Sequence, residues 1–439
     1  MAHPKPTPGP IIIIGAGQAG FSAADKLRDL GHAGPITLIG AEAQLPYQRP
    51  PLSKAYLLGA LGRERLFLRP AEHFARREID LRLGVRATAI RPGARAVVLS
   101  DGTSVPYDRL LLATGAMPRR LPEAIGGTLA GVMTMRNLAD ADGFAAAIRA
   151  ARRLLVVGGG YVGLEAAASA RKLGVAVTLI EAADRILKRV AAPETAAYFR
   201  KLHQDHGVDL REGVALSRLE GQGGRVTSAV LGDGQRLEAD LVLVGIGVEP
   251  ETGLAEAAGI AADGGIVVDA FCETSHAGIY AAGDCAAFPW QGERLRLESV
   301  GNAIDQAEVA AANMLGHAVT YQARPWFWSD QYDTKLQIAG LSRRFDQVVV
   351  RAGGSEQARS IWYFAAGKLQ AVDAINKPRV FMIAKRLLEG GLPVDPAGVA
   401  KPGTDLRALL ADQGEKAPAH NTDSRGSGLV AVPGRRGTS

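Results

Sequence analysis

Blocks of apolar residues separated by glycine-rich turns predict an α/β fold. Residues Ile11–Ile14 are four consecutive β-branched residues, which indicates a buried strand. Glycines follow at positions 15, 17 and 20, and a helical pattern then continues to Gly31. A second apolar strand covers residues 36–39. Strand, glycine turn, helix and strand in this order form one βαβ unit of a parallel sheet.

The same pattern occurs again near the middle of the chain. An apolar strand at residues 154–157 leads into glycines at positions 158, 160 and 163. A helical stretch at 164–173 and a strand at 175–180 follow. Two complete copies of the pattern predict two doubly wound units with a parallel sheet in each.

The last third of the chain has a different rhythm. Strand-like segments begin at Trp326, Gln337, Val348 and Ile361, with turns between them, and a helix is expected from Val380 to Leu388. We therefore predict an α/β fold with two Rossmann-like dinucleotide-binding domains plus a C-terminal α+β domain.

The two glycine patterns carry the chemistry. In the first, Gly15 allows the tight turn, Gly17 allows the backbone to approach a pyrophosphate, and Gly20 lets helix and strand pack closely. The pyrophosphate would lie at the helix N-terminus, where free N–H groups favour anions. Glu42 lies about 20 residues further on, where a carboxylate can accept hydrogen bonds from ribose hydroxyls.

In the second pattern, Gly158, Gly160 and Gly163 have the same spacing, and Glu181 ends the following strand. A carboxylate there accepts from a free ribose 2′-hydroxyl and repels a 2′-phosphate, which favours NADH over NADPH. Nearby Arg185 or Arg189 could override that preference.

Other polar residues leave alternatives open. The prolines of residues 45–54 predict an extended loop rather than a helix, and from these residues alone Arg49 and Lys54 read as solvated surface charges rather than cofactor contacts. Asp284 follows a strand and a glycine, so it either accepts from cofactor hydroxyls or caps a turn or helix. His203 and His206 lie near a helix end with no further ligands close by, which favours a solvated helix end over a metal site.

Composition narrows the classes. The net charge is +6, but the two tails supply half of it, so nucleic-acid binding is disfavoured. No apolar run reaches the roughly 18 residues of a membrane span, and the proline-rich start lacks a signal peptide's apolar core. We expect a cytoplasmic protein with no membrane partner.

Cys272 and Cys285 do not form a C-x-x-C pair, so neither a redox dithiol nor a four-cysteine cluster is expected. Residues 413–439 read as a disordered tail.

Taken together, the motifs resemble those of the FAD-dependent ferredoxin reductases of the putidaredoxin-reductase and rubredoxin-reductase group. That group includes the reductase components of bacterial oxygenase systems and is related to glutathione reductase, so the resemblance implies a fold like that of glutathione reductase. The resemblance covers about residues 10–410 and rests on the following segments: GAGQAG, LPYQRPPLSKAYL, LLLATGAMPR, VVGGGYVGLEAAA, LVGIGVEP, YAAGDCA, ESVGNAIDQA, PWFWSDQY and AVDAINKPR.

The resemblance implies roles for particular residues. The first glycine loop, with Ala19 among its members, would hold the FAD pyrophosphate, and Glu42 would hold the FAD ribose. The family's other FAD-contacting positions correspond to Arg49, Lys54, Ala87, Thr114, Gly115, Arg136, Asp284, Val300 and Trp328. The second loop would hold NADH, with Glu181 on its adenosine ribose and Arg189 close by.

By the same resemblance, Glu165 would pair with Lys54 near the flavin and tune it, which reverses the surface reading of Lys54; a distant ion pair is the alternative. In other members a proline often follows the ESV segment, whereas this chain has Gly301. The implied division is an FAD-binding domain split over 10–115 and 249–322, an NADH-binding domain at 116–248, and a C-terminal domain at 323–412.

The implied activity is NADH-dependent reduction of a small 2Fe–2S ferredoxin that serves a haem-thiolate monooxygenase or a ring-hydroxylating dioxygenase. We expect a monomer or weak dimer that docks the ferredoxin transiently, and the candidate docking cations are Arg343, Arg344, Lys377, Arg379, Lys385 and Arg386. A disulfide reductase is disfavoured by the missing C-x-x-C pair. A signalling or binding flavoprotein resembling apoptosis-inducing factor is the alternative from another class.

Overall fold

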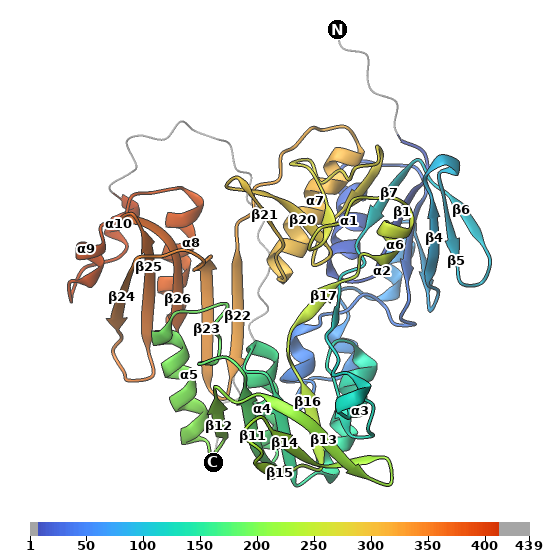
Figure 1. The fold of residues 1–439 in the computed structure, drawn as a ribbon. Coiled ribbons are helices and arrows are strands. Elements are labelled where there is room, and N and C mark those ends of the chain that lie inside the picture. The colour runs from blue at the N-terminus through green and yellow to red at the C-terminus, as the bar shows by residue number, and fades with distance from the viewer. Residues whose placement is uncertain (1–7, 412–439) are drawn as a thin grey trace, which may run out of the picture.

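The computed structural model describes residues 8–411 and contains two parallel sheets and one antiparallel sheet of five strands each, together with smaller sheets (Figure 1). The predicted tail at 413–439 lies outside the described residues. The first sheet has the order β19-β7-β1-β2-β3, and all its pairings are parallel. Its strands are β1 (Ile11–Ile14), β2 (Ile36–Gly40), β3 (Ile79–Leu83), β7 (Arg109–Leu112) and β19 (Ile279–Ala281).

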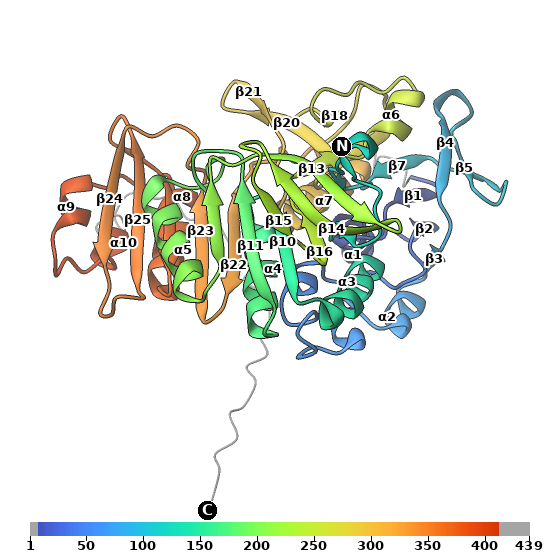
Figure 2. The ribbon, with the colours of Figure 1, turned by 60° about the horizontal axis from the view of Figure 1, so that its bottom comes forward.

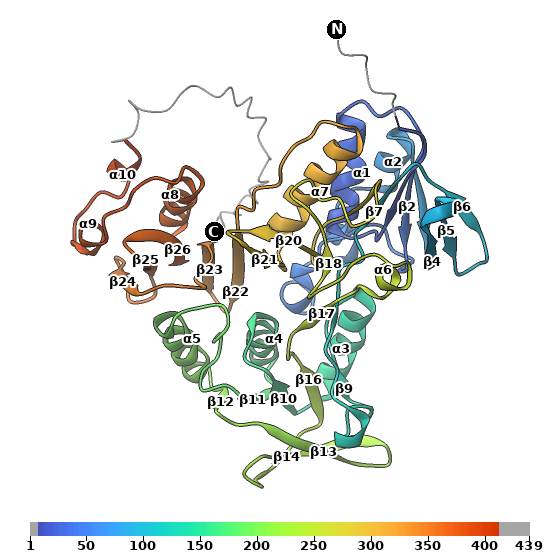
Figure 3. The same cartoon turned by 45° about the horizontal axis from the view of Figure 1, so that its top comes forward.

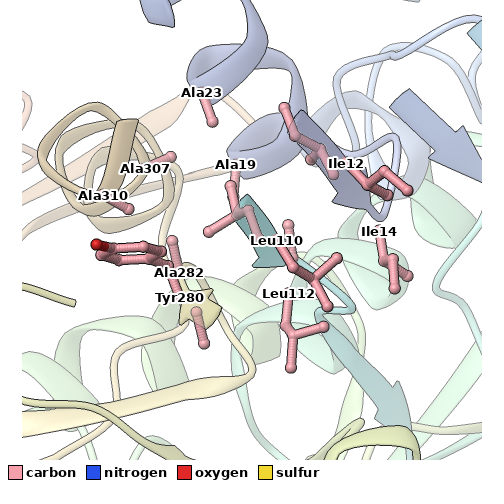
Figure 4. Packing of buried hydrophobic residues seen from close by; sticks show 14 of the residues in the cluster. Ile12, Ile14, Ala19, Ala23, Leu110, Leu112, Tyr280, Ala282, Ala307 and Ala310 are labelled. Atoms are coloured by element: carbon pink, nitrogen blue, oxygen red, sulfur yellow. The ribbon is translucent and has the colours of Figure 1, made fainter. Parts of the chain in front are cut away.

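Two helices with many alanines pack against each other beside the first sheet. They are α1 (Gln18–Asp29) and α7 (Val300–Met314). Small side chains let helices and strands approach closely where they meet. Figure 4 shows this core, to which the following residues contribute: Ile12, Ile14, Ala19, Ala23, Leu110, Leu112, Tyr280, Ala282, Ala307 and Ala310.

The second parallel sheet repeats this arrangement in the order β12-β11-β10-β16-β9. Its strands are β9 (Val132–Met133), β10 (Arg153–Val157), β11 (Ala176–Glu181), β12 (Asp209–Glu212) and β16 (Leu241–Val244). The helices that accompany it are α3 (Leu138–Ala150), α4 (Tyr161–Lys172) and α5 (Pro193–Asp205).

The C-terminal sheet is antiparallel, with the order β22-β23-β26-β25-β24. It comprises β22 (Trp326–Gln331), β23 (Thr334–Gly340), β24 (Gln347–Ala352), β25 (Arg359–Ala365) and β26 (Lys368–Ile375). One face shares an apolar core with α4 and α5, so these helices lie between two sheets (Figure 3). The other face packs against α8 (Pro378–Glu389), close to the helix expected at 380–388.

Shorter elements complete the described chain. The antiparallel sheet β4-β5-β6 stands at the end of the molecule remote from the C-terminal sheet (Figure 2). The remaining elements are β4 (Ala87–Arg91), β5 (Ala96–Leu99), β6 (Ser104–Pro106), β8 (Ala116–Pro118), β13 (Leu216–Gln222), β14 (Arg225–Leu231), β15 (Arg236–Glu238), β17 (Val248–Pro250), β18 (Ile266–Val267), β20 (Ala286–Trp290), β21 (Glu293–Leu295), α2 (Ala71–Arg76), α6 (Gly253–Ala257), α9 (Pro396–Ala400) and α10 (Ala408–Ala411), with 3-10 turns at Pro50–Ser53, Arg63–Leu66, Pro92–Ala94 and Glu123–Ile125. Within residues 8–411, no helix combines the length and the apolar character needed to cross a membrane.

Two local predictions were wrong. The proline segment is not fully extended, because Pro50–Ser53 forms a 3-10 helix with proline at its first positions. Proline's fixed φ suits the first turn of a helix as well as an extended chain. Both glycine-loop helices also begin earlier than expected, so Gly20 and Gly163 lie inside α1 and α4.

Candidate functional site

The first glycine loop connects β1 to α1. Gly15 has φ +115°, and a Cβ there would lie 2.1 Å from the carbonyl oxygen of Ala113. A Cβ on Gly20 would lie 1.9 Å from the carbonyl oxygen of Gly15. Gly17 differs, because a Cβ there would meet nothing within 4 Å. The loop is therefore closed against the backbone of Ala113 at Gly15 and against its own backbone at Gly20, and it is open at Gly17, as a pyrophosphate cradle requires.

The second loop has the same geometry. Gly158 has φ +108° and would place a Cβ 2.5 Å from the carbonyl oxygen of Gly245, while Gly163 would place one 2.2 Å from that of Gly158. Gly160, the middle glycine, faces open space. Both cradles also end at a helix N-terminus, so each fits a dinucleotide phosphate.

Beside the first loop, Glu42 is held by two partners. Tyr47 Oη donates to Glu42 Oε2 at 2.6 Å, and Arg49 Nη2 donates to Glu42 Oε1 at 2.7 Å. The Tyr47 hydroxyl also accepts from the backbone N–H of Leu138 at 2.9 Å. Burial raises the pKa of Tyr47 well above its ordinary value, so the phenol stays protonated. The sequence reasoning missed Tyr47, although it lies between the prolines of the segment that carries Arg49.

Arg49 also leads to a second ion pair. Its Nη1 donates to the carbonyl oxygen of Arg136 at 2.9 Å, and Arg136 Nη2 donates to Asp284 Oδ2 at 3.0 Å. Gly115 leaves room for this pair, because a Cβ there would lie 3.2 Å from Arg136 Nη2. Thr114 Oγ1 donates to the carbonyl oxygen of Glu251 at 2.7 Å. Arg49, Arg136 and Asp284, far apart in sequence, thus meet in one cluster.

Glu181 stands at the second loop, at the end of β11. Its Oε2 accepts from the backbone N–H of Gly159 at 2.7 Å, and its Oε1 accepts from that of Ala183 at 2.8 Å. The carboxylate is therefore fixed against the glycine loop that it was expected to serve. Arg189 is exposed and lies beside Gly247, since a Cβ on that glycine would be 3.3 Å from Arg189 Nη2.

Lys54 and Glu165 form an ion pair between the two parallel-sheet units. Lys54 Nζ lies 3.0 Å from Glu165 Oε1, and their side chains are 15% and 6% exposed. Ser53 Oγ donates to Glu165 Oε2 at 2.7 Å, and Ser329 Oγ donates to Oε1 at 2.8 Å. Glu165 thus accepts hydrogen bonds from one cation and two hydroxyl groups at a largely buried position. The reading of Lys54 as a solvated charge from the residues alone was wrong.

Trp328 lies on β22 and stacks with Trp326, with ring centroids 5.4 Å apart. Gly301 lies in the first turn of α7, next to Val300, and a Cβ on Gly301 would come within 2.3 Å of Trp326 Nε1. The absence of a side chain at Gly301 therefore leaves the space that the Trp326 indole occupies. Ala87 is the first residue of β4 and pairs with Leu99.

The two histidines of the α5 end differ from each other. His206 is exposed, as predicted, but His203 is completely buried and its Nε2 lies 2.8 Å from Gln331 Oε1. The prediction of a solvated end was wrong for His203, because the C-terminal sheet covers that side of the helix. In the described part of the chain, no group of three or more His, Cys, Asp or Glu side chains could hold a metal ion. Both cysteines are buried and free.

Comparison with known proteins gives a consistent result along most of the described chain. Residues 9–307 match the model of the family described as pyridine nucleotide-disulphide oxidoreductase, and residues 326–410 match the reductase C-terminal model. The chain is 43% identical to rhodocoxin reductase of Rhodococcus erythropolis, over 91% of this chain and 94% of that protein. It is 42% identical to the 5,5′-dehydrodivanillate O-demethylase ferredoxin reductase subunit of a Sphingobium species, over 92% and 98%.

A solved structure of similar fold is the covalent putidaredoxin reductase–putidaredoxin complex. Its TM-score against this chain is 0.89 at 40% identity, with 93% of this chain and 99% of that one covered.

Proposed function

Because the chain belongs to the pyridine nucleotide-disulphide oxidoreductase family, we propose that it is an NADH-dependent flavoprotein reductase that passes electrons through FAD to a 2Fe–2S ferredoxin. One observation carries the proposal: the chain has two glycine cradles of the same geometry, and the buried Lys54–Glu165 pair joins the two units that carry them. One relative named above is a ferredoxin reductase subunit by name, and the similar structure is a complex of putidaredoxin reductase with putidaredoxin.

The first cradle holds FAD, because its surroundings match the groups of that cofactor. Gly17 leaves open space for the pyrophosphate, and Glu42 offers carboxylate oxygens to the ribose. Arg49, Arg136 and Asp284 supply charges at the same site. When bound, FAD accepts a hydride equivalent from NADH and releases electrons singly. Thr114, Gly115, Val300, Ala87 and Trp328 belong to this proposed site through the family resemblance.

The second cradle holds NADH. Gly160 is open to the pyrophosphate, and Glu181 offers its carboxylate to the adenosine ribose. A cytoplasmic location is part of the same proposal, because a protein that oxidises NADH must meet that coenzyme. The domain division at residues 115, 249 and 323 and the monomeric or weakly dimeric state also remain proposals.

The electron acceptor is a ferredoxin rather than a disulfide. Burial raises the pKa of the Cys272 and Cys285 thiols, so neither offers a thiolate for dithiol exchange. The family name thus describes the fold and the coenzyme sites, while the reaction at a dithiol has no counterpart among the described residues. The terminal enzyme would be a haem-thiolate monooxygenase or a ring-hydroxylating dioxygenase.

NADH-driven reduction of cytochrome c, with and without an added 2Fe–2S ferredoxin, tests the function. We expect the rate of cytochrome c reduction to depend strongly on the ferredoxin, because the ferredoxin carries single electrons from the bound FAD to the haem of cytochrome c. Rapid NADH oxidation that ignores the ferredoxin would contradict the proposal and favour an oxidase or a signalling flavoprotein.

Lys54 and Glu165 tune the environment of the bound FAD rather than acting as an acid–base pair. Glu165→Gln removes the negative charge and leaves Lys54 Nζ without its counter-ion. We expect the rate constant of FAD reduction by NADH, measured by stopped flow, to fall about tenfold. Glu194→Gln, at an exposed position of α5, is the control. Unaltered pre-steady-state kinetics for Glu165→Gln would contradict the role.

A further inference from the structure

A line of buried polar side chains runs from Glu165 on α4, along one face of β22, to His203 on α5. Ser329 Oγ donates to Glu165 Oε1 at 2.8 Å, and Gln331 Nε2 donates to Ser329 Oγ at 3.1 Å. His203 Nε2 then lies 2.8 Å from Gln331 Oε1. Ser329, Gln331 and His203 are all 0% exposed. Buried polar groups in such a line are costly unless each one is satisfied by the next.

The hydrogen bonds of this line point in one direction. Because the amide oxygen of Gln331 can only accept, His203 must carry its proton on Nε2. Its Nδ1 is then free to accept from Tyr332 Oη, which lies 3.3 Å away. Burial lowers the pKa of His203 to about 4, so the ring is neutral near pH 7 and keeps this donor–acceptor polarity. Every donor in the line therefore points toward the Glu165 carboxylate.

Three separate elements supply the line. Ser329 and Gln331 are two residues apart on β22, so they share the face that packs on α4 and α5. Glu165 comes from α4 and His203 from α5. At the outer end the Tyr332 ring stacks on His206, with centroids 3.6 Å apart. The line thus ties the position of Glu165 to the docking of the C-terminal sheet.

We propose that Ser329, Gln331 and His203 are positioning residues, which hold the Glu165 carboxylate against Lys54 and so set the charge beside the bound FAD. The inference rests on the proposed function for the identity of the cofactor. The carboxamide of Gln331 relays protons poorly, so the line orients and polarises rather than conducts. Without Ser329, one lone pair of Glu165 Oε1 loses its donor in a place that water scarcely reaches.

The test uses matched variants of the FAD-loaded full chain. Ser329→Ala removes the inner donor, and His203→Leu removes the outer one, while His203→Gln keeps an N–H donor for Gln331. Ser360→Ala is the control, because Ser360 is equally buried in the same sheet but accepts from Trp362 Nε1 instead of reaching Glu165. The midpoint potential of bound FAD, measured by dye-equilibrated titration, and the stopped-flow rate constant of its reduction by NADH are the two readouts.

We expect Ser329→Ala and His203→Leu to shift the potential by less than Glu165→Gln does, because the carboxylate stays in place but loses the donors that position it. We also expect Ser329→Ala to lower the reduction rate constant about fivefold to tenfold, which is within the range for the loss of one typical hydrogen bond. His203→Gln restores most of both values, and Ser360→Ala changes neither. Because a purely structural role would lower the melting temperature without this pattern of rescue, the thermal unfolding of each variant is recorded alongside.

The outcomes separate this inference from the proposed function. The potential is measured without NADH or ferredoxin. A Ser329→Ala protein with the wild-type potential and rate constant would overturn the inference, even if ferredoxin reduction proceeds normally. A wild-type chain that takes no electrons from NADH would overturn the proposed function, while the shift in potential would still support the inference.

Discussion

At the scale of single residues, the position of a side chain in the strand pattern made some candidate residues predictable. Others were missed because their burial cannot be predicted from local sequence. Glu181 was predicted from its place at the end of a strand, and the structure shows its carboxylate bound to the backbone of Gly159 and Ala183. Tyr47 and His203 were not predicted, since nothing in their local sequence shows that they become buried. Which face of α5 is covered depends on a sheet more than 120 residues further along the chain.

The preference for NADH should depend on the Glu181 carboxylate. Glu181→Ala removes the ribose acceptor and the charge that repels a 2′-phosphate, so we expect kcat/KM for NADH to fall about tenfold and the preference over NADPH to narrow. Glu181→Gln keeps an oxygen acceptor for one of the two backbone N–H groups, of Gly159 and Ala183, and serves as the control for loop geometry. Steady-state kinetics with both coenzymes measure the ratio, and an unchanged ratio in Glu181→Ala would contradict the assignment.

At the scale of elements, the two strand–glycine–helix units were predicted well, because glycine spacing and apolar runs are local signals. The helix starts were misplaced by a few residues, since the last glycine of each pattern packs from inside the helix against the first. β3 was not predicted at all. Its five residues alternate between apolar and charged side chains, but the strand is short and only Ile79 is fully buried, so the local signal is weak.

Alanine at the middle glycine of the second loop should impair coenzyme binding, whereas alanine at the last glycine should impair folding. Gly160→Ala adds a methyl to open space, so the chain should fold and retain FAD while its KM for NADH rises about tenfold. Gly163→Ala places the methyl against the backbone of Gly158, so we expect loss of folded protein. FAD content and thermal melting separate the two effects. A Gly160→Ala protein with unchanged coenzyme affinity would show that the cradle does not approach NADH.

The contact between β26 and α5 should make stability depend on pH. Asp373 is completely buried, and its Oδ2 accepts from Thr195 Oγ1 at 2.7 Å and from Tyr363 Oη. Burial raises its pKa from 3.8 to about 6. The folded chain therefore binds this proton more tightly than the unfolded chain does, and its contribution to stability declines as the pH rises from about 4 to about 6.

Asp373→Asn should remove that dependence. The unfolding free energy of the parent falls over this pH range, and that of the variant does not. The difference, variant minus parent, should therefore increase by about 3 kcal/mol between pH 4 and pH 6 or above. Urea unfolding at a series of pH values, with parent and variant side by side, measures the difference. A difference that stays constant across this range would mean that Asp373 titrates as an exposed carboxylate does.

At the scale of the whole molecule, pairing between strands that are far apart in the sequence decides which residues meet, and local sequence does not specify this pairing. β19, from residues 279–281, completes the edge of a sheet otherwise built from residues 11–112. Asp284 reaches Arg136 only because of that pairing. The family resemblance anticipated both residues at one site, whereas the residues themselves left Asp284 undecided between a cofactor contact and a cap.

The same scale decides where a ferredoxin docks. Of the candidate cations, Arg344 already pairs with Glu293, and Lys385 lies over the Trp326 ring and near Glu389. Arg379 and Arg386 are exposed on α8, seven residues apart and therefore on one face, with half-exposed Met382 between them. Neither arginine has an ion-pair partner among the described side chains. A face of this kind fits an acidic partner that binds transiently.

Reversing these charges should weaken docking without affecting the coenzyme sites. We expect Arg379→Glu with Arg386→Glu to raise the KM for ferredoxin about tenfold, while the rate constant of FAD reduction by NADH stays at the parent value. Raising the salt concentration should lower kcat/KM of the parent and bring it toward that of the variant, because salt screens exposed charges beyond about 10 Å at 0.1 M. Arg91→Glu, at the end of β4 on the remote side of the molecule (Figure 1), is the control for charge alone. If turnover is constant from low to high salt, or if Arg91→Glu weakens docking equally, the α8 face is not the ferredoxin contact.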